Sequence, residues 1–383
     1  MPREPDPSWE DGMRSLHADE MEGIVALTSA VFRPTLVAEY PHFFTRENAS
    51  NLRVVVEKGK VVSHIGTLRR DASILGCTVR NAALGGVATY EAHRGKGHAT
   101  ALFEDTMRAC REDGVDFMLV SGYRKMYHRF GCRYVGMDWR FKVDRAQCEA
   151  FDDEALEIDE ATEADLPELM RLYRRESVRW IRPPSDFKHA LAGVVMNQPS
   201  VIHVLRKQGT VSGYMIVQDP KGQTGIEGKV FEFAGAREAV AGALGGVIKK
   251  HDLAGLSLHV MGCDGLLQDI LKGRGARCSP EAGSGTVTLI NFIQFMERMR
   301  PYFTEVVGEA SARGLVFEQR GDQMIFRYGG EAVVAENQGK AAEIIFGTHG
   351  GKEARSLKEG GKAGEVLAEI FPIPALWYGL NFV

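Results

Sequence analysis

The chain has 383 residues, of which 44% are hydrophobic and 26% are charged, a composition typical of a globular protein with room for two or three domains. Its formal net charge of −4 gives no basic surface, which argues against nucleic acid as the main partner. A polar, acidic N-terminus and the lack of any apolar run near about 18 residues predict a cytoplasmic protein with no membrane partner.

Metal binding is not predicted. None of the six cysteines forms a C-x-x-C pair or has a histidine at the spacing of a zinc site. His93 and His98 flank a basic turn, but they lie five residues apart, which does not place them on one helical face.

The first predicted unit, residues 1–148, mixes helices with mostly antiparallel strands. Apolar spacing predicts a helix within 14–27, and β-branched or apolar runs predict strands at 52–56, 61–68, 82–90 and 115–120. A short helical segment at 123–131 and a closing strand at 132–143 complete the unit.

The most informative stretch joins the strand at 82–90 to a helix that ends at Gly114. The turn between them contains Arg94, Gly95, Lys96 and Gly97. The first turn of a helix leaves N–H groups unpaired and carries partial positive charge, and glycines let a ligand approach the backbone. We therefore expect a diphosphate to bind there. A solvated basic turn without a ligand is the alternative.

The pattern Arg94-x-x-Gly97-x-Ala99, followed by a strand and by Tyr127-x-x-Phe130-Gly131, resembles the acetyl-CoA signature of the GNAT acetyltransferases. The resemblance implies that β-strand backbone pairs with the pantetheine arm and that the turn cradles the diphosphate of acetyl-CoA, the co-substrate. The residues implied are Val87, Ala88, Thr89, Arg94, Gly95, Lys96, Gly97, His98, Ala99 and Thr100.

Tyr127 occupies the place of the catalytic tyrosine in this pattern. The resemblance implies that its phenol protonates the departing thiolate of CoA. The alternative is a core tyrosine whose hydroxyl bonds to the backbone.

The second predicted unit, residues 149–285, repeats the first. An acidic linker at 149–160 precedes a helix at 165–172 and strands at 201–205, 211–217 and 230–234. The turn after the last strand, however, lacks the Arg-x-x-Gly-x-Ala pattern and carries Glu238, which would repel a diphosphate. This unit is predicted to be a degenerate copy without a CoA site.

The third predicted unit, residues 286–383, resembles a sterol-carrier-protein-like α+β domain. The three units in this order resemble the enhanced-intracellular-survival acetyltransferases. The fold expected is therefore α/β (α+β), with two GNAT-fold domains in tandem followed by the sterol-carrier-like domain. The resemblance also implies a homo-oligomer, such as a hexamer.

Acetyl transfer to an amine also requires a base, and no Asp or Glu of the first unit stands out by its spacing. In the resembled family the C-terminal carboxylate serves as the base, which implies this role for Val383 at the end of the apolar tail 371–383. The family's tail ends in an aromatic residue, whereas here Val383 follows Phe382. A tail that only closes the core of the third unit is the alternative.

The resemblance implies direct acetyl transfer to a primary amine of a small cationic acceptor, such as an aminoglycoside- or polyamine-like compound, or of a lysine. The acceptor pocket would form at the loop that contains Glu39, Tyr40, His42, Phe43 and Phe44. The alternative is that these residues only pack the connection between a helix and a strand. The rival function is a lipid or small-ligand carrier that acyl-CoA regulates and that has no transferase activity.

Overall fold

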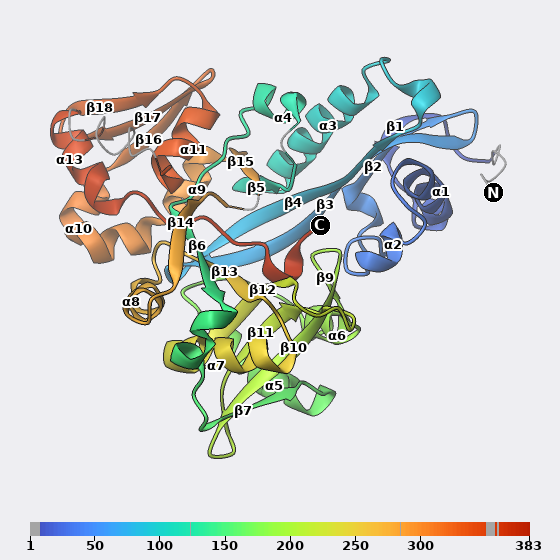
Figure 1. The fold of residues 1–383 in the computed structure, drawn as a ribbon. Coiled ribbons are helices and arrows are strands. Elements are labelled where there is room, and N and C mark those ends of the chain that lie inside the picture. The colour runs from blue at the N-terminus through green and yellow to red at the C-terminus, as the bar shows by residue number, and fades with distance from the viewer. Residues whose placement is uncertain (1–7, 123, 284, 350–356, 358–359) are drawn as a thin grey trace.

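The computed structural model describes residues 8–122, 124–283, 285–349, 357 and 360–383. Three sheets and their helices form a mixed α/β protein, which confirms the predicted fold class. Figure 1 shows the first sheet above the second and the orange-to-red third unit to one side. No helix in the described part of the chain has the length and apolarity needed to cross a membrane.

The first sheet has seven strands. They are β1 (Gly12–Ser15), β2 (Leu52–Glu57), β3 (Lys60–Ile74), β4 (Cys77–Thr89), β5 (Phe117–Val120) and β15 (Thr286–Leu289), with β8 (Val178–Trp180) paired to β3. Among the described strands of this sheet, only β4 and β5 run parallel. The helices of this unit are α1 (Met21–Val31), α2 (Leu36–Glu39), α3 (His98–Glu112) and α4 (Lys125–Arg129).

The second sheet repeats the order and directions of the first. Its strands, in order, are β7 (Leu156–Glu160), β10 (Gln198–Lys207), β11 (Thr210–Gln218), β12 (Glu227–Gly235), β13 (Gly255–Val260), β6 (Asp138–Asp144) and β14 (Arg277–Glu281), with β9 (Val194–Val195) beside β10. Its one parallel pair is β12 and β13, joined by α7 (Arg237–Lys250) as β4 and β5 are joined by α3. The other helices are α5 (Leu166–Tyr173), α6 (Pro184–Leu191) and α8 (Gly265–Gly273). This correspondence supports the predicted internal repeat.

The third unit has a three-stranded sheet and helices on it. These elements are β16 (Val316–Arg320), β17 (Gln323–Tyr328), β18 (Glu331–Ala335), α9 (Phe292–Arg298), α10 (Arg300–Gly314), α11 (Gln338–Phe346) and α13 (Gly361–Ile370). Its likeness to a sterol carrier protein stays a prediction.

Two strands lie in a different sheet from the one that the predicted division into units implies. The closing strand of the first unit, β6, pairs with β13 and β14 of the second sheet. In exchange, β15 from the start of the predicted third unit pairs with β5. The backbone N–H and C=O groups of both strands form hydrogen bonds with residues far away in the chain. Local sequence patterns do not reveal such long-range pairing. The division at residues 148 and 285 stays a prediction.

Two local expectations also change. The region 14–27 begins as a strand, because β1 pairs with β2, and the helix starts only at Met21. The acidic stretch 149–160 is not a bare linker, since β7 within it pairs with β10.

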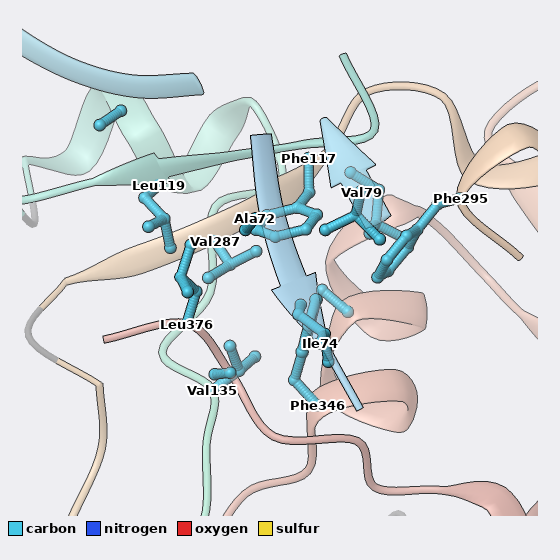
Figure 2. Packing of buried hydrophobic residues seen from close by; sticks show 14 of the residues in the cluster. Ala72, Ile74, Val79, Phe117, Leu119, Val135, Val287, Phe295, Phe346 and Leu376 are labelled. Atoms are coloured by element: carbon cyan, nitrogen blue, oxygen red, sulfur yellow. The ribbon is translucent and has the colours of Figure 1, made fainter. Parts of the chain in front are cut away.

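Apolar side chains bind the first sheet to the third unit. Figure 2 shows Ala72, Ile74 and Val79 of β3 and β4 beside Phe117 of β5 and Phe295 and Phe346 of the third unit. The ring of Phe117 lies 5.2 Å from that of Phe295 and 5.4 Å from that of Phe346. The opposite face of the sheet packs on the apolar side of α3 through Leu102, Phe103 and Met107. This packing fixes the parallel strands β4 and β5 between two layers.

Candidate active site

The parallel strands β4 and β5 separate at their carboxyl ends. Their ladder ends at Leu84 and Val120, whereas β4 continues to Thr89. Just beyond this point β4 has a bulge, since two of its residues, Gly86 and Val87, face one residue of β3. Gly86 has a φ of 64°, which favours glycine. The separation leaves an edge of β4 open to an extended ligand.

A pocket of about 260 Å³ fills the space between the separated strands. Residues from several parts of the chain line it. They include Leu84, Gly85, Gly86 and Val87 of β4, Val120, Ser121 and Gly122 at the end of β5, Tyr127 of α4, aromatic residues after α1, and Phe382 and Val383. The pocket therefore combines the open strand edge with the C-terminus.

Tyr127 is 4% exposed, and its ring lies 5.8 Å from that of Phe103. Among the described residues, no protein group bonds to its hydroxyl. Burial raises the pKa of Tyr127 above its ordinary value, so the phenol keeps its proton at neutral pH. A protonated hydroxyl facing the pocket is the state that a proton donor requires.

Val383 lies against Gly85 at the start of the open edge of β4. A Cβ added to Gly85 would lie 2.9 Å from the carboxyl carbon of Val383. Val383 itself is 7% exposed. The tail therefore places the terminal carboxyl group in the same pocket as Tyr127.

Buried polar groups of the second unit hold the tail in place. Glu232 accepts a hydrogen bond from the Leu380 N–H at 3.1 Å and forms a buried ion pair with Arg182 at 2.8 Å. The side-chain amide of Asn381 donates to Asp186 at 2.8 Å, and both residues are buried. Because chain ends fray unless they are anchored, these bonds explain how a terminus can hold a defined position.

A groove of about 600 Å³ lies next to the pocket, over the start of α3. The helix begins after Gly97, which has a φ of 83°, and the N–H groups of Thr100 and Ala101 bond to the carbonyl of Gly97. The N–H groups of the first helical residues, His98 and Ala99, precede the intrahelical ladder and are free to bind an anion. The groove thus has the geometry of a diphosphate cradle.

Glu57, at the end of β2, reaches the rim of this groove. Its carboxylate lies 3.1 Å from His93 Nδ1, 3.0 Å from His98 Nε2 and 3.4 Å from Lys96 Nζ. The nearby cations hold the pKa of Glu57 below its ordinary value, although burial acts in the opposite direction. Glu57, His93 and His98 could together hold a cation, since their ligand atoms lie within 4.8 Å of one another. Lys96 places a positive charge at the same point.

Residues 12–135 match the family described as the acetyltransferase (GNAT) domain. This segment is a GNAT domain. It contains the cradle, the separated strands and Tyr127, and the GNAT fold implies an acyl-CoA co-substrate. No curated protein matches the chain significantly.

Solved structures share the fold well beyond the GNAT domain. A GCN5-related N-acetyltransferase from Anabaena variabilis is 14% identical, with a TM-score of 0.67 over 95% of this chain and 98% of that one. A probable N-acyltransferase from Enterococcus faecalis is 14% identical, with a TM-score of 0.68 over 96% and 99%. Eis1 from Mycobacterium abscessus is 14% identical, with a TM-score of 0.64 over 97% and 100%. At this identity the likeness shows a common fold alone.

The structure gathers most of the residues predicted for CoA binding. The groove is lined by Val87, Thr89, Arg94, Gly95, Gly97, His98, Ala99 and Thr100. Two predicted residues do not line it. Ala88 is buried in the core on the other face of β4, and the Lys96 side chain turns to Glu57. Their backbone roles in the GNAT domain stay predictions, as do the catalytic roles of Tyr127 and Val383.

Sequence reasoning missed part of the site. Gly85 and Gly86 were not assigned a role, although two glycines inside a strand pattern indicate a bulge or a close approach of another backbone. Of the predicted acceptor loop, Tyr40, Phe43 and Phe44 line the pocket of the GNAT domain, whereas Glu39 pairs with Arg33. No local sequence pattern could have identified Glu57 as a residue of the site, because a charged residue before a hairpin turn is common.

Proposed function

We propose that this protein is an acetyl-CoA-dependent N-acetyltransferase that transfers the acetyl group directly to a primary amine. One observation carries the proposal: Tyr127 and the terminal residue Val383 line one pocket at the point where β4 and β5 of a GNAT domain separate. A proton donor and a carboxylate thus lie on the same reaction space, beside the groove proposed for the diphosphate.

In the proposed reaction, the edge of β4 and the first turn of α3 hold the co-substrate. An alkylamine has a pKa near about 10, so only about one molecule in a thousand is neutral at pH 7. The Val383 carboxylate accepts the proton of the amine, whose nitrogen forms a bond to the acetyl carbon. An N–H at the β4 bulge stabilises the oxyanion. When the C–S bond breaks, Tyr127 gives its proton to the sulfur.

The acceptor expected from the sequence is a small amine of the aminoglycoside or polyamine type, or a lysine. A primary amine is the part of that expectation on which the proposed chemistry depends, since the nitrogen must lose a proton after attack.

Two measurements test the function. Acetyl-CoA should raise the melting temperature of the full-length protein, and free thiol should appear at a rate that depends on the added primary amine. If fatty acids or sterols stabilise the protein while acetyl-CoA neither binds nor releases thiol, the protein is a ligand carrier and the proposal is wrong.

A further inference from the structure

The wall of the pocket away from β4 is aromatic and apolar. It consists of Phe32, Leu36, Tyr40, Phe43, Phe44 and Phe382. Tyr40 and Phe44 are each 8% exposed, and the ring of Tyr40 lies 6.4 Å from that of Phe382. Burial raises the pKa of Tyr40 to about 12, so its phenol is neutral. The surface available to the body of an acceptor therefore carries aromatic rings.

The charges around the pocket are unfavourable for a polycation. Arg33 and Arg124 line it, and no Asp or Glu does so in the described part of the chain. Glu39 lies nearby, but its carboxylate is taken up by Arg33, whose Nε lies 2.8 Å away. The terminal carboxylate of Val383 is the remaining negative group on the lining. One ammonium group could find a partner there, whereas a second would be desolvated without a carboxylate partner.

The aromatic wall itself disfavours a multi-ring aminosugar. The hydroxyl and ammonium groups of such a compound would lose their hydration against the rings of the wall without finding hydrogen-bond partners there.

We propose that the acceptor is an arylalkylamine, that is, a monoamine with a flat apolar body, and not a polycation. This inference rests on the proposed acetyltransferase function. The ring of the acceptor packs on Tyr40, Phe44 and Phe382, and its single nitrogen points to Val383 and the thioester. The inference departs from the aminoglycoside or polyamine acceptor that the sequence resemblance implies.

A panel of amines tests the proposal in a thiol-release assay with acetyl-CoA and the full-length protein. We expect kcat/KM for 2-phenylethylamine to exceed that for spermidine or kanamycin by about tenfold or more, because a buried second charge lacks a partner. A preference for spermidine or kanamycin would overturn the inference and leave the transferase function standing. If no amine releases thiol although acetyl-CoA binds, the function itself fails.

A charge variant sharpens the test. Phe32 lines the pocket but is 41% exposed, so Phe32→Glu adds a carboxylate there without burying it in the core. It should lower the ratio of kcat/KM for 2-phenylethylamine over spermidine by about tenfold, through attraction of the polyamine. Val25→Glu adds the same charge to α1 at a site that is 37% exposed and does not line the pocket, and it should leave the ratio unchanged. An equal change in both variants would contradict the assignment of the wall.

Discussion

The carboxyl carbon of Val383 lies so close to Gly85 that a Cβ at Gly85 would come within 2.9 Å of it. Real Cβ atoms do not approach other atoms this closely, so the terminus occupies a position that only glycine leaves open. The two residues are 298 positions apart in the sequence, yet they meet where β4 and β5 diverge. This contact fixes the register of the tail at the pocket.

The position of the terminal carboxylate can be tested by changing the length of the chain. Deleting Val383, or adding one Gly after it, moves the carboxylate by about 3.5 Å along the tail. We expect kcat to fall by about 100-fold or more, since the base no longer reaches the amine. Val383→Ala keeps the carboxylate in place and serves as the control. Stabilisation by CoA should survive in all three variants, and unchanged kcat in the two length variants would refute a terminal base.

Gly85→Ala tests the same carboxylate from the other side of the contact. The added methyl group should push Val383 out of position and lower kcat. Combined with deletion of Val383, it should add little further loss, because both changes act on one group. The kcat values of the unchanged protein, the two single variants and the double variant form a double-mutant cycle. Fully additive losses would mean that Gly85 acts independently of the terminus.

Removing the hydroxyl of Tyr127 should abolish proton donation to the thiolate. Tyr127→Phe is expected to lower kcat by about 10²- to 10⁴-fold, while affinity for CoA stays near that of the unchanged protein. Tyr134→Phe removes a hydroxyl from a nearby tyrosine that is 43% exposed and should have little effect. Steady-state kinetics and calorimetric CoA titration separate the two effects. An equal loss of turnover and of CoA binding would instead indicate a structural tyrosine.

Glu57 contacts Lys96 and the two histidines at the groove, where it would compete with the proposed diphosphate for their charge. Glu57→Gln removes this negative charge, so KM for acetyl-CoA should fall severalfold, with a larger effect at low salt. Glu104→Gln removes an equal charge from the exposed face of α3 and is the matched control. A rise in KM in Glu57→Gln would show that Glu57 positions the groove instead of competing for it.

His64 makes the fold sensitive to acid. It is completely buried, which lowers its pKa to about 4, and its Nδ1 lies 3.1 Å from the carbonyl of Arg53. The unfolded chain takes up a proton near pH 6.5 and the folded protein does not, so stability from neutral His64 is present above pH 6.5 and is lost as pH falls toward 4. The loss should reach about 2 kcal/mol at pH 5.

Urea unfolding at pH 7 and pH 5 measures this effect. His64→Gln should reduce the difference in unfolding free energy between the two pH values, even if it lowers stability at both. His17→Gln, at an exposed position, should leave that difference unchanged. Burial also lowers the pKa of His42 to about 4 and that of His203 to about 3, so part of the acid sensitivity will remain.

The sequence alone determined the α/β fold class and the local shape of the groove at the start of α3. The turn from Arg94 to Gly97, the helix after it and the segment around Tyr127 depend on backbone torsions and helical spacing within a few residues. Such short-range preferences depend only on residues that are neighbours in the sequence, so the groove could be predicted from them.

Only the tertiary structure decided how the remote parts of the chain meet. The exchange of β6 and β15 between the sheets, the contact of Val383 with Gly85 and the approach of Glu57 to Lys96 each join residues far apart in sequence. The same holds for the aromatic wall, where Phe382 packs beside Tyr40. Contacts of this kind depend on shape, burial and charge in the assembled core, and no local pattern encodes which distant surfaces will fit together.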